Sequence, residues 1–287
     1  MPRPPPVPPV ERVRSRLAQS VGDRVAALLP RGYQRLGDLL IVRWPEPLTP
    51  FSREVADAYR AEFRVRNVLA LDGGEEGEFR RPRVRALFPD EGTETLHREA
   101  GVLWELDASE VMFSQGNRHE RERMARVVQP GERVGDLFAG IGYFTLPMAR
   151  RGTRSMFWAV EKNPVAFGYL QRNLRRNGLS DRVRALLGDN REVDLPLASF
   201  DRVVLGYLPS SLPFLPRAVR LLDPGGGYVH AHLLAGSHDP VGEALESFHR
   251  AARTSGAEVL ESTWHPVKAY GPGRIHGVVE ARLTPRP

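Results

Sequence analysis

The sequence predicts an α/β protein in which a small mixed α/β domain precedes a doubly wound, Rossmann-like domain. In the second part of the chain, short apolar strands alternate with helical segments, which is typical of a parallel sheet with helices on both faces. The first part instead combines two helical segments with a series of short strands. We place the boundary near residues 107–110, which gives domains at 11–108 and 109–287 behind a flexible, Pro-rich leader at 1–10.

The expected elements follow from hydrophobic spacing and from Gly and Pro punctuation. In the first domain we expect helices over residues 10–29 and 52–62, and strands within 33–44 and over 64–70, 83–87, 94–98 and 102–106. In the second we expect strands over 133–138, 155–160, 183–187, 201–205, 227–232, 258–262 and 276–283, with helices over 143–150, 164–177 and 213–222.

The composition excludes several classes of protein. The chain has 287 residues, 41% of them hydrophobic and 26% charged, as in globular proteins. It contains no cysteine, which excludes disulfides, thiolate metal sites and a cysteine nucleophile. No apolar run approaches the roughly 18 residues of a membrane span, and the N-terminus lacks the apolar core of a signal peptide. We therefore expect a cytoplasmic protein without membrane association, and we expect no metal site.

The charge balance is compatible with a nucleic-acid partner but does not require one. The net charge is +6, all but two of the 41 basic residues are Arg, and the excess lies entirely in residues 109–287. Arginine binds phosphates in a bidentate manner, whereas a general preference for Arg in the source lineage would give the same composition.

Three short motifs follow successive predicted strands. Residues 136–145 (DLFAGIGYFT) place two glycines between a strand and a helix, where a nucleotide can approach the backbone. The third glycine of a dinucleotide site is missing, so a nucleoside without a pyrophosphate fits better. Glu161 follows the next strand, in a position to accept the ribose hydroxyls, and Asp189 and Asn190 follow the third, where they could contact an adenine edge.

Each motif alone has a simpler explanation. A glycine pair is often only a tight turn, and Glu161 could cap the helix that begins at Asn163-Pro164. In this order, however, the three motifs resemble those of class I S-adenosylmethionine-dependent transferases.

The flanking segments narrow the resemblance. Residues 111–121 (VMFSQGNRHER), 188–191 (GDNR) and 206–211 (GYLPSS) are similar to those of the family that contains the tRNA guanine-N1 methyltransferases and the wybutosine-synthesis aminocarboxypropyl transferases. Similar segments in the first domain and at residues 267–270 extend the resemblance over roughly residues 20–285.

Two positions favour the aminocarboxypropyl transferases. The methyltransferases carry an Asn-Leu-Pro signature after the fourth strand and a Ser-Pro-Arg turn before the cofactor helix. Here the chain has Gly206-Tyr207-Leu208-Pro209 and Ser114-Gln115-Gly116-Asn117. An Asn at position 206 would offer hydrogen bonds to a guanine, and Gly206 offers none.

The resemblance implies transfer of the 3-amino-3-carboxypropyl group of S-adenosylmethionine to a modified guanine beside the anticodon of tRNA, with release of methylthioadenosine. The alternatives are an S-adenosylmethionine-dependent methyltransferase acting on tRNA or a small molecule, and a non-catalytic module that binds the cofactor and RNA. A different acceptor for the same group also stays open.

The resemblance also implies the site residues. Glu120 and Tyr207 are the candidate catalytic groups, although Tyr207 could instead only pack as an aromatic. The cofactor is expected to contact Phe113, Ser114, Arg118, Arg121, Asp136, Phe138, Ala139, Gly140, Gly142, Tyr143, Phe144, Glu161, Lys162, Asn163, Asp189, Asn190, Gly206 and Tyr207. For Arg121 the simpler explanation is a solvated helix face, because residues 118–123 form a mixed-charge run.

We expect a monomer that binds tRNA. The arginines that could contact RNA phosphates are Arg172, Arg175, Arg176, Arg182 and Arg184. Arg175 and Arg176 have an ordinary explanation as well, because cations are favoured at a helix C-terminus.

Overall fold

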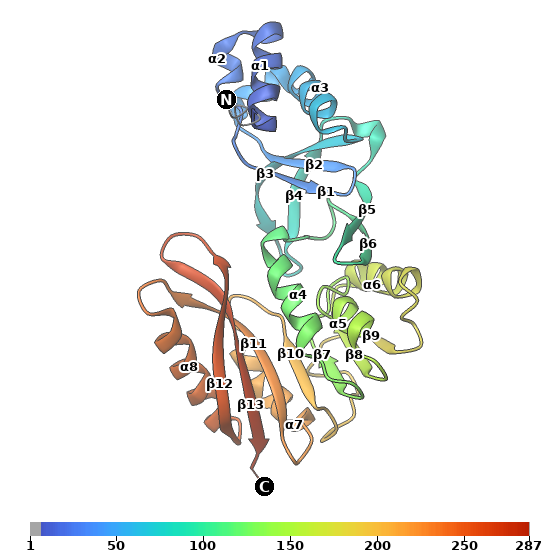
Figure 1. The fold of residues 1–287 in the computed structure, drawn as a ribbon, viewed down its shortest axis with the longest axis vertical. Helices are drawn as coiled ribbons and strands as arrows, with labels where there is room; N and C mark the ends of the chain where they lie inside the picture. The colour runs from blue at the N-terminus through green and yellow to red at the C-terminus, as the bar shows by residue number, and fades with distance from the viewer. Residues whose placement is uncertain (1–6, 287) are drawn as a thin grey trace, which may run out of the picture. The chain divides into compact units, whose positions relative to one another are not determined.

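The computed structural model describes residues 7–286 and contains two compact units (Figure 1). The first unit runs to Glu99 and includes Leu103–Phe113, and the second comprises Ala100–Val102 and the chain from Ser114 onward. This division lies a few residues beyond the expected boundary at 107–110, because Phe113 packs on Trp104, with ring centroids 5.4 Å apart. Residues 1–6 of the expected leader lie outside the described residues, and its last two residues belong to a helix.

The first unit is built on a four-stranded sheet in the order β1-β2-β3-β4, in which β2 and β3 are parallel and the other pairs antiparallel. Its elements are α1 (Pro9–Val21), α2 (Asp23–Ala26), β1 (Tyr33–Leu36), β2 (Leu39–Arg43), η1 (Glu46–Phe51), α3 (Ser52–Phe63), β3 (Asn67–Glu76), β4 (Arg81–Ala86), η2 (Pro89–Glu91) and the two-stranded sheet β5 (Glu94–Glu99) and β6 (Val102–Asp107).

One helix of this unit differs from the prediction. The expected single helix over residues 10–29 is interrupted at Gly22, which has φ +89° and separates α1 from α2. Only glycine adopts this conformation without strain. The helix therefore breaks at Gly22, although the apolar spacing that predicted a single helix continues beyond it. Val13, Leu17 and Tyr59 are buried where α1 and α3 meet.

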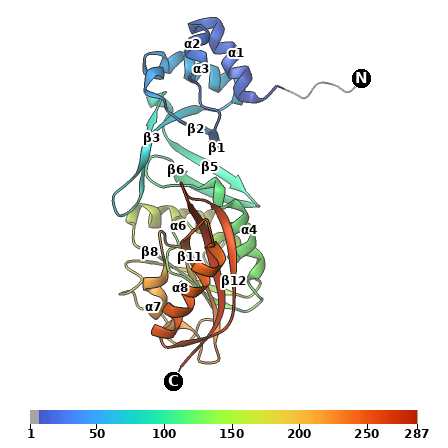
Figure 2. The ribbon, with the colours of Figure 1, turned by 90° about the vertical axis from the view of Figure 1, so that its left-hand side faces the viewer.

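The second unit contains a seven-stranded sheet in the order β12-β13-β11-β10-β7-β8-β9 (Figures 1 and 2). Its elements are η3 (Gln115–Asn117), α4 (Arg118–Val127), β7 (Arg133–Asp136), α5 (Thr145–Arg151), β8 (Met156–Glu161), α6 (Pro164–Arg176), β9 (Val183–Leu187), β10 (Arg202–Leu205), η4 (Leu212–Phe214), α7 (Leu215–Leu221), β11 (Gly227–Gly236), α8 (Pro240–Thr254), β12 (Ala257–Ala269) and β13 (Arg274–Pro285).

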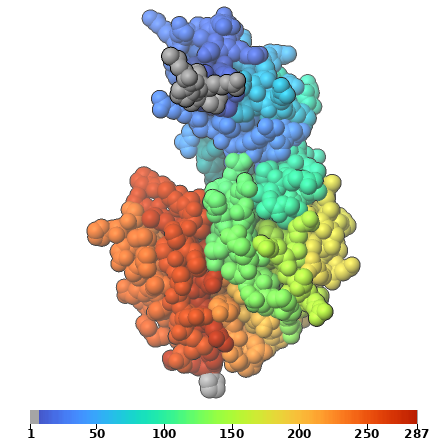
Figure 3. Space-filling model, in the orientation of Figure 1, coloured from blue at the N-terminus to red at the C-terminus, as the bar shows by residue number. Residues whose placement is uncertain are grey.

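The sheet is parallel from β11 to β9, as expected, and becomes antiparallel at β13 and β12. The sequence analysis missed α8 and underestimated both C-terminal strands. The helix α8 packs on β11 and β12 and buries Ala244, Phe248 and Ala252 in the main core. The hairpin that β12 and β13 form reaches the surface in the space-filling view, in red (Figure 3).

This topology positions the candidate site. The parallel strands β7, β8, β9 and β10 end at one edge of the sheet, so the residues that follow them come together there. Among residues 7–286, no helix combines the length and the hydropathy that a membrane crossing requires.

Candidate active site

The glycine loop after β7 turns sharply at two positions. Gly140 has φ +57° and Gly142 has φ +101°, and a Cβ on Gly142 would lie 2.5 Å from Leu146 Cδ1. The loop is fixed to the neighbouring strands because Leu137 N donates to Val204 O and Ala139 N to Val160 O, at 3.0 and 2.9 Å. Glycine is therefore required at both positions, because a larger residue would be strained and would overlap a neighbouring side chain.

Asp136 joins the strand to the helix that follows the loop. Its carboxylate accepts a hydrogen bond from Thr145 Oγ1 at 2.7 Å and from Phe138 N at 3.3 Å. The residue is only 1% exposed, and this burial raises the pKa of its carboxyl to about 6. Asp136 thus links Phe138, at the start of the loop, to Thr145, at its end.

Glu161 contacts the same loop from the end of β8. One carboxylate oxygen accepts from Gly140 N and the other from Asn163 N, both at 2.7 Å. Burial raises the pKa of this carboxyl, and the backbone hydrogen bonds that it accepts reduce that rise. The helix cap that was the alternative for Glu161 is supplied by Asn163, whose side chain accepts from Val165 N at 2.9 Å. Glu161 therefore bridges the loop and the N-terminus of α6.

Asp189 and Asn190 follow β9 and have different environments. Asp189 accepts two hydrogen bonds from the Arg191 guanidinium, which hold the pKa of its carboxyl well below its usual range, and Lys162 Nζ lies 3.4 Å away. Asn190 is 5% exposed, and its Nδ2 donates to Leu137 O at 3.3 Å. Within residues 7–286 the buried Asn190 Oδ1 has no hydrogen-bond partner, so it can accept from an exocyclic amine.

Aromatic side chains surround the end of β10. The rings of Phe138, Tyr207 and Phe214 lie with centroids 4.7–5.4 Å apart, and Tyr207 is 40% exposed. A Cβ on Gly206 would lie 3.3 Å from a Phe144 ring carbon, so a larger side chain there would displace that ring. The sequence analysis missed Phe214, whose only signal is its place in the first turn of a helix after β10.

The turn before α4 is held from two sides. Arg121 Nη1 donates to Ser114 O at 2.9 Å, and Lys268 Nζ donates to Ser114 Oγ at 2.6 Å. Arg121 is only 2% exposed, so the solvated-face explanation of this residue is wrong. The sequence analysis attached no role to Lys268, because 154 residues separate it from its partner.

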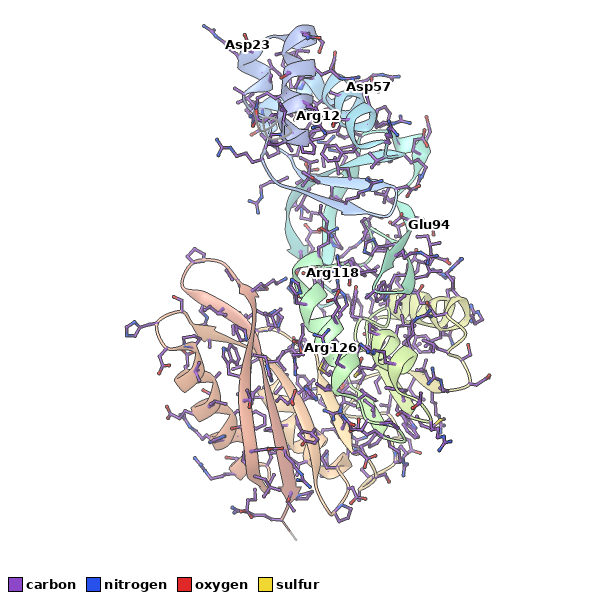
Figure 4. All side chains as sticks on the ribbon, viewed as in Figure 1. Arg12, Asp23, Asp57, Glu94, Arg118 and Arg126 are labelled. Carbon is purple, nitrogen blue, oxygen red and sulfur yellow. The ribbon has the colours of Figure 1, made fainter. Side chains whose placement is uncertain are left out.

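Three other expected residues of this segment have different environments. Glu120 is 4% exposed and both of its oxygens accept from Arg123 at 2.8 Å, while burial raises the pKa of its carboxyl. Arg118 lies at the exposed start of α4, with Arg126 near its end (Figure 4), and pairs with Glu122 at 2.9 Å. Phe113 belongs to the first unit, where it is buried.

The site therefore offers a glycine loop, a carboxylate at the next strand end and a buried unpaired amide oxygen after that. These groups fit an adenine nucleoside, with Glu161 for the ribose and Asn190 for the base. Among the described residues 7–286, His, Asp and Glu form no cluster of three or more that could hold a metal ion.

Comparison with known proteins agrees with this geometry. Residues 95–260 match the family model of the TRM5/TYW2 methyltransferase domain, and residues 13–93 match that of the TYW2 N-terminal domain. The chain belongs to the TRM5/TYW2 family. The resemblance seen in the sequence is thereby confirmed. For the N-terminal domain, the matching model is that of TYW2.

Relatives of both branches of the TRM5/TYW2 family match most of the chain. A tRNA(Phe) (4-demethylwyosine(37)-C(7)) aminocarboxypropyltransferase from Pyrococcus horikoshii is 34% identical over 95% of this chain and 96% of its own length. The crystal structure of P. horikoshii TYW2 in complex with MeSAdo has a TM-score of 0.82 and 31% identity, covering 96% of this chain and 99% of that chain. The tRNA (guanine(37)-N(1))-methyltransferase Trm5b from Pyrococcus abyssi is 28% identical over 92% of this chain and 78% of its own length.

These matches confirm the expected fold and cofactor. The fold is that of the S-adenosylmethionine-dependent transferases, and members of the TRM5/TYW2 family have been solved with MeSAdo or AdoMet. The roles of the individual site residues stay predictions.

Proposed function

We propose that this protein transfers the 3-amino-3-carboxypropyl group of S-adenosylmethionine to C7 of 4-demethylwyosine at position 37 of tRNA(Phe), releasing methylthioadenosine. The observation that carries the proposal is Gly206 at the end of β10. Residue 206 has no side chain, and a Cβ there would lie 3.3 Å from the Phe144 ring, so the site has no amide at this point. A guanine entering here would meet no side-chain donor or acceptor from residue 206, which argues against methylation at N1.

S-adenosylmethionine, when bound, would supply an electrophilic γ-carbon. The bond from C7 of the acceptor to this carbon would form as the bond from sulfur to the same carbon breaks, with methylthioadenosine as the leaving group and the C7 proton passing to a base. The chain's part is to bind and to orient, which can contribute about 7–11 kcal/mol to lowering the barrier. We assign Glu161 to the ribose, Asn190 to the adenine and the loop from Phe138 to Phe144 to the backbone contacts.

Of the two candidate catalytic residues, Tyr207 is the more accessible. It is partly exposed at the end of β10, and its ring packs against those of Phe138 and Phe214. A planar base can stack on this aromatic cluster. Glu120 is buried and paired with Arg123, so we assign it a positioning role that holds α4 against β13 through the Arg123–Glu280 contact.

The tRNA is expected to contact exposed arginines of the second unit. Arg175, Arg176 and Arg184 are exposed, whereas Arg182 donates to Gly152 O at 2.6 Å and the Arg172 guanidinium lies 4.0 Å from the Tyr169 ring centroid. We therefore propose the first three for phosphate contacts. We further propose that the protein acts as a monomer in the cytoplasm. Light scattering of the pure protein would test the oligomeric state.

The experiment is a reaction with S-adenosylmethionine and tRNA(Phe) that carries 4-demethylwyosine, analysed by mass spectrometry of the nucleosides. We expect methylthioadenosine in amounts that depend on the tRNA, together with a nucleoside heavier by the aminocarboxypropyl group. Formation of S-adenosylhomocysteine instead would overturn the proposal and favour the methyltransferase alternative.

A further inference from the structure

Lys268 reaches the cofactor side of the sheet from the C-terminal hairpin. The β12–β13 register shifts between Pro266 and Lys268, so one extra residue lies on β12 at this point, and Lys268 is then paired with His276. A bulge of this kind redirects the side chains beside it. The Lys268 ammonium donates to the Ser114 hydroxyl at 2.6 Å.

The turn at Ser114 is shaped to receive this lysine. A Cβ on Gly116 would lie 2.9 Å from Lys268 Cδ and 3.8 Å from Cε. The alkyl part of Lys268 therefore passes over Gly116 through space that any larger residue would occupy. On the other side of the turn, Arg121 holds the Ser114 carbonyl oxygen. Two cations thus hold the carbonyl oxygen and the hydroxyl of one residue.

The sheet order places the C-terminal hairpin and the residues expected to bind the nucleoside on opposite sides of the glycine loop. Glu161 and Asn190 follow β8 and β9, on one side of the glycine loop after β7. The hairpin of β12 and β13 lies on the other side, beyond β10 and β11. A cofactor whose nucleoside contacts Glu161 and Asn190 would extend its amino-acid end across the glycine loop, toward Ser114 and Lys268.

We propose that Lys268 is a positioning residue that, through Ser114, fixes the amino-acid end of S-adenosylmethionine and leaves the nucleoside end unaffected. This inference rests on the proposed function for the identity of the cofactor. In this proposal a residue of β12 orients the aminocarboxypropyl group that is transferred.

The test compares two ligands that share the methylthioadenosine part and differ in the aminocarboxypropyl group and in the sulfonium charge that goes with it. Isothermal titration calorimetry of the full chain measures binding of S-adenosylmethionine and of methylthioadenosine, which lacks the aminocarboxypropyl group. The variant Lys268→Met keeps the alkyl packing over Gly116 and loses the ammonium. We expect it to weaken S-adenosylmethionine binding about tenfold and methylthioadenosine binding less than twofold.

Three further variants separate positioning from general effects. Lys268→Arg should recover most of the affinity, and Gly116→Ala should reproduce part of the loss because its Cβ displaces the lysine. Arg253→Met, which removes an exposed charge from α8, should leave both affinities unchanged. A general charge effect has the opposite sign, because S-adenosylmethionine carries a net positive charge and the loss of a cation would strengthen its binding.

Equal weakening for the two ligands, or none for either, would overturn the role of Lys268. A loss of tRNA affinity with unchanged S-adenosylmethionine binding would overturn it in favour of a phosphate contact. Because these titrations contain no acceptor, they are independent of the reaction assay. Failure of the wild-type chain to bind S-adenosylmethionine would instead count against the proposed function itself.

Discussion

The carboxylate of Asp136 lowers the stability of this protein at neutral pH. Asp136 is almost completely buried between β7 and α5, and its pKa is raised from 3.8 to about 6. The folded protein therefore binds a proton more tightly than the unfolded chain does. The stabilisation by this proton is present below about pH 4 and is lost as the pH rises through 6.

The size of the effect follows from the shift. A rise of the Asp136 pKa from 3.8 to about 6 corresponds to about 3 kcal/mol of unfolding free energy at pH 8, relative to an aspartate with an ordinary pKa. In Asp136→Asn the amide oxygen can still accept from Phe138 N, and the amide nitrogen can donate to Thr145 Oγ1. We therefore expect this variant to be more stable than wild type by about 1–3 kcal/mol at pH 8.

The assay is urea unfolding of wild type and variant at half-unit steps from pH 4 to 8. The difference in unfolding free energy should be near zero at pH 4 and should grow through pH 6. Asp239→Asn, at the exposed cap of α8, is the control for an Asp-to-Asn change that removes no buried carboxylate. A variant that is less stable than wild type at pH 8, or a difference that does not change with pH, would refute the reasoning.

Three further predictions concern the loop and its partners. Gly142→Ala should destabilise the fold by about 2–4 kcal/mol, because its Cβ meets Leu146 at a positive φ; a loss below 1 kcal/mol in urea unfolding would contradict this. Glu161→Ala should weaken both S-adenosylmethionine and methylthioadenosine at least about tenfold in calorimetry, and selective loss of one ligand would be unexpected. The double variant Arg175→Ala/Arg176→Ala should lower tRNA affinity and reduce the slope of log K against log salt by about 1–2, and an unchanged slope would place the RNA elsewhere.

The parallel part of the sheet could be predicted because its signals are local. The expected strands over 133–138, 155–160 and 201–205 correspond to β7, β8 and β10, which end at Asp136, Glu161 and Leu205. Parallel strand ends meet at one edge. The glycines at 140 and 142 marked the turn, and the structure shows left-handed backbone at both. The two segments that the sequence analysis used to favour one branch of the family, 206–209 and 114–117, stay predictions in that respect.

The missing parts depend on contacts between distant segments. Lys268 acquires its place only when the C-terminal hairpin pairs with β11, and neither its neighbours in sequence nor any periodicity indicated that. The charged run 118–123 suggested a solvated face, yet Arg121 and Glu120 are buried. Arg121 donates to Ser114 O, and Glu120 pairs with Arg123, which also contacts the distant Glu280 of β13. The helix α8 was overlooked although its cap at Asp239 and its apolar spacing were visible in the sequence.

The central claim is that the acceptor receives the aminocarboxypropyl group rather than the methyl group. The direct measurement uses two preparations of S-adenosylmethionine, one with ¹⁴C in the methionine carboxyl group and the other with ¹⁴C in the methyl group, each with tRNA(Phe) carrying 4-demethylwyosine. The account predicts that the carboxyl label enters the tRNA and that the methyl label leaves in methylthioadenosine. Methyl label in the tRNA, with the carboxyl label left in S-adenosylhomocysteine, would contradict it.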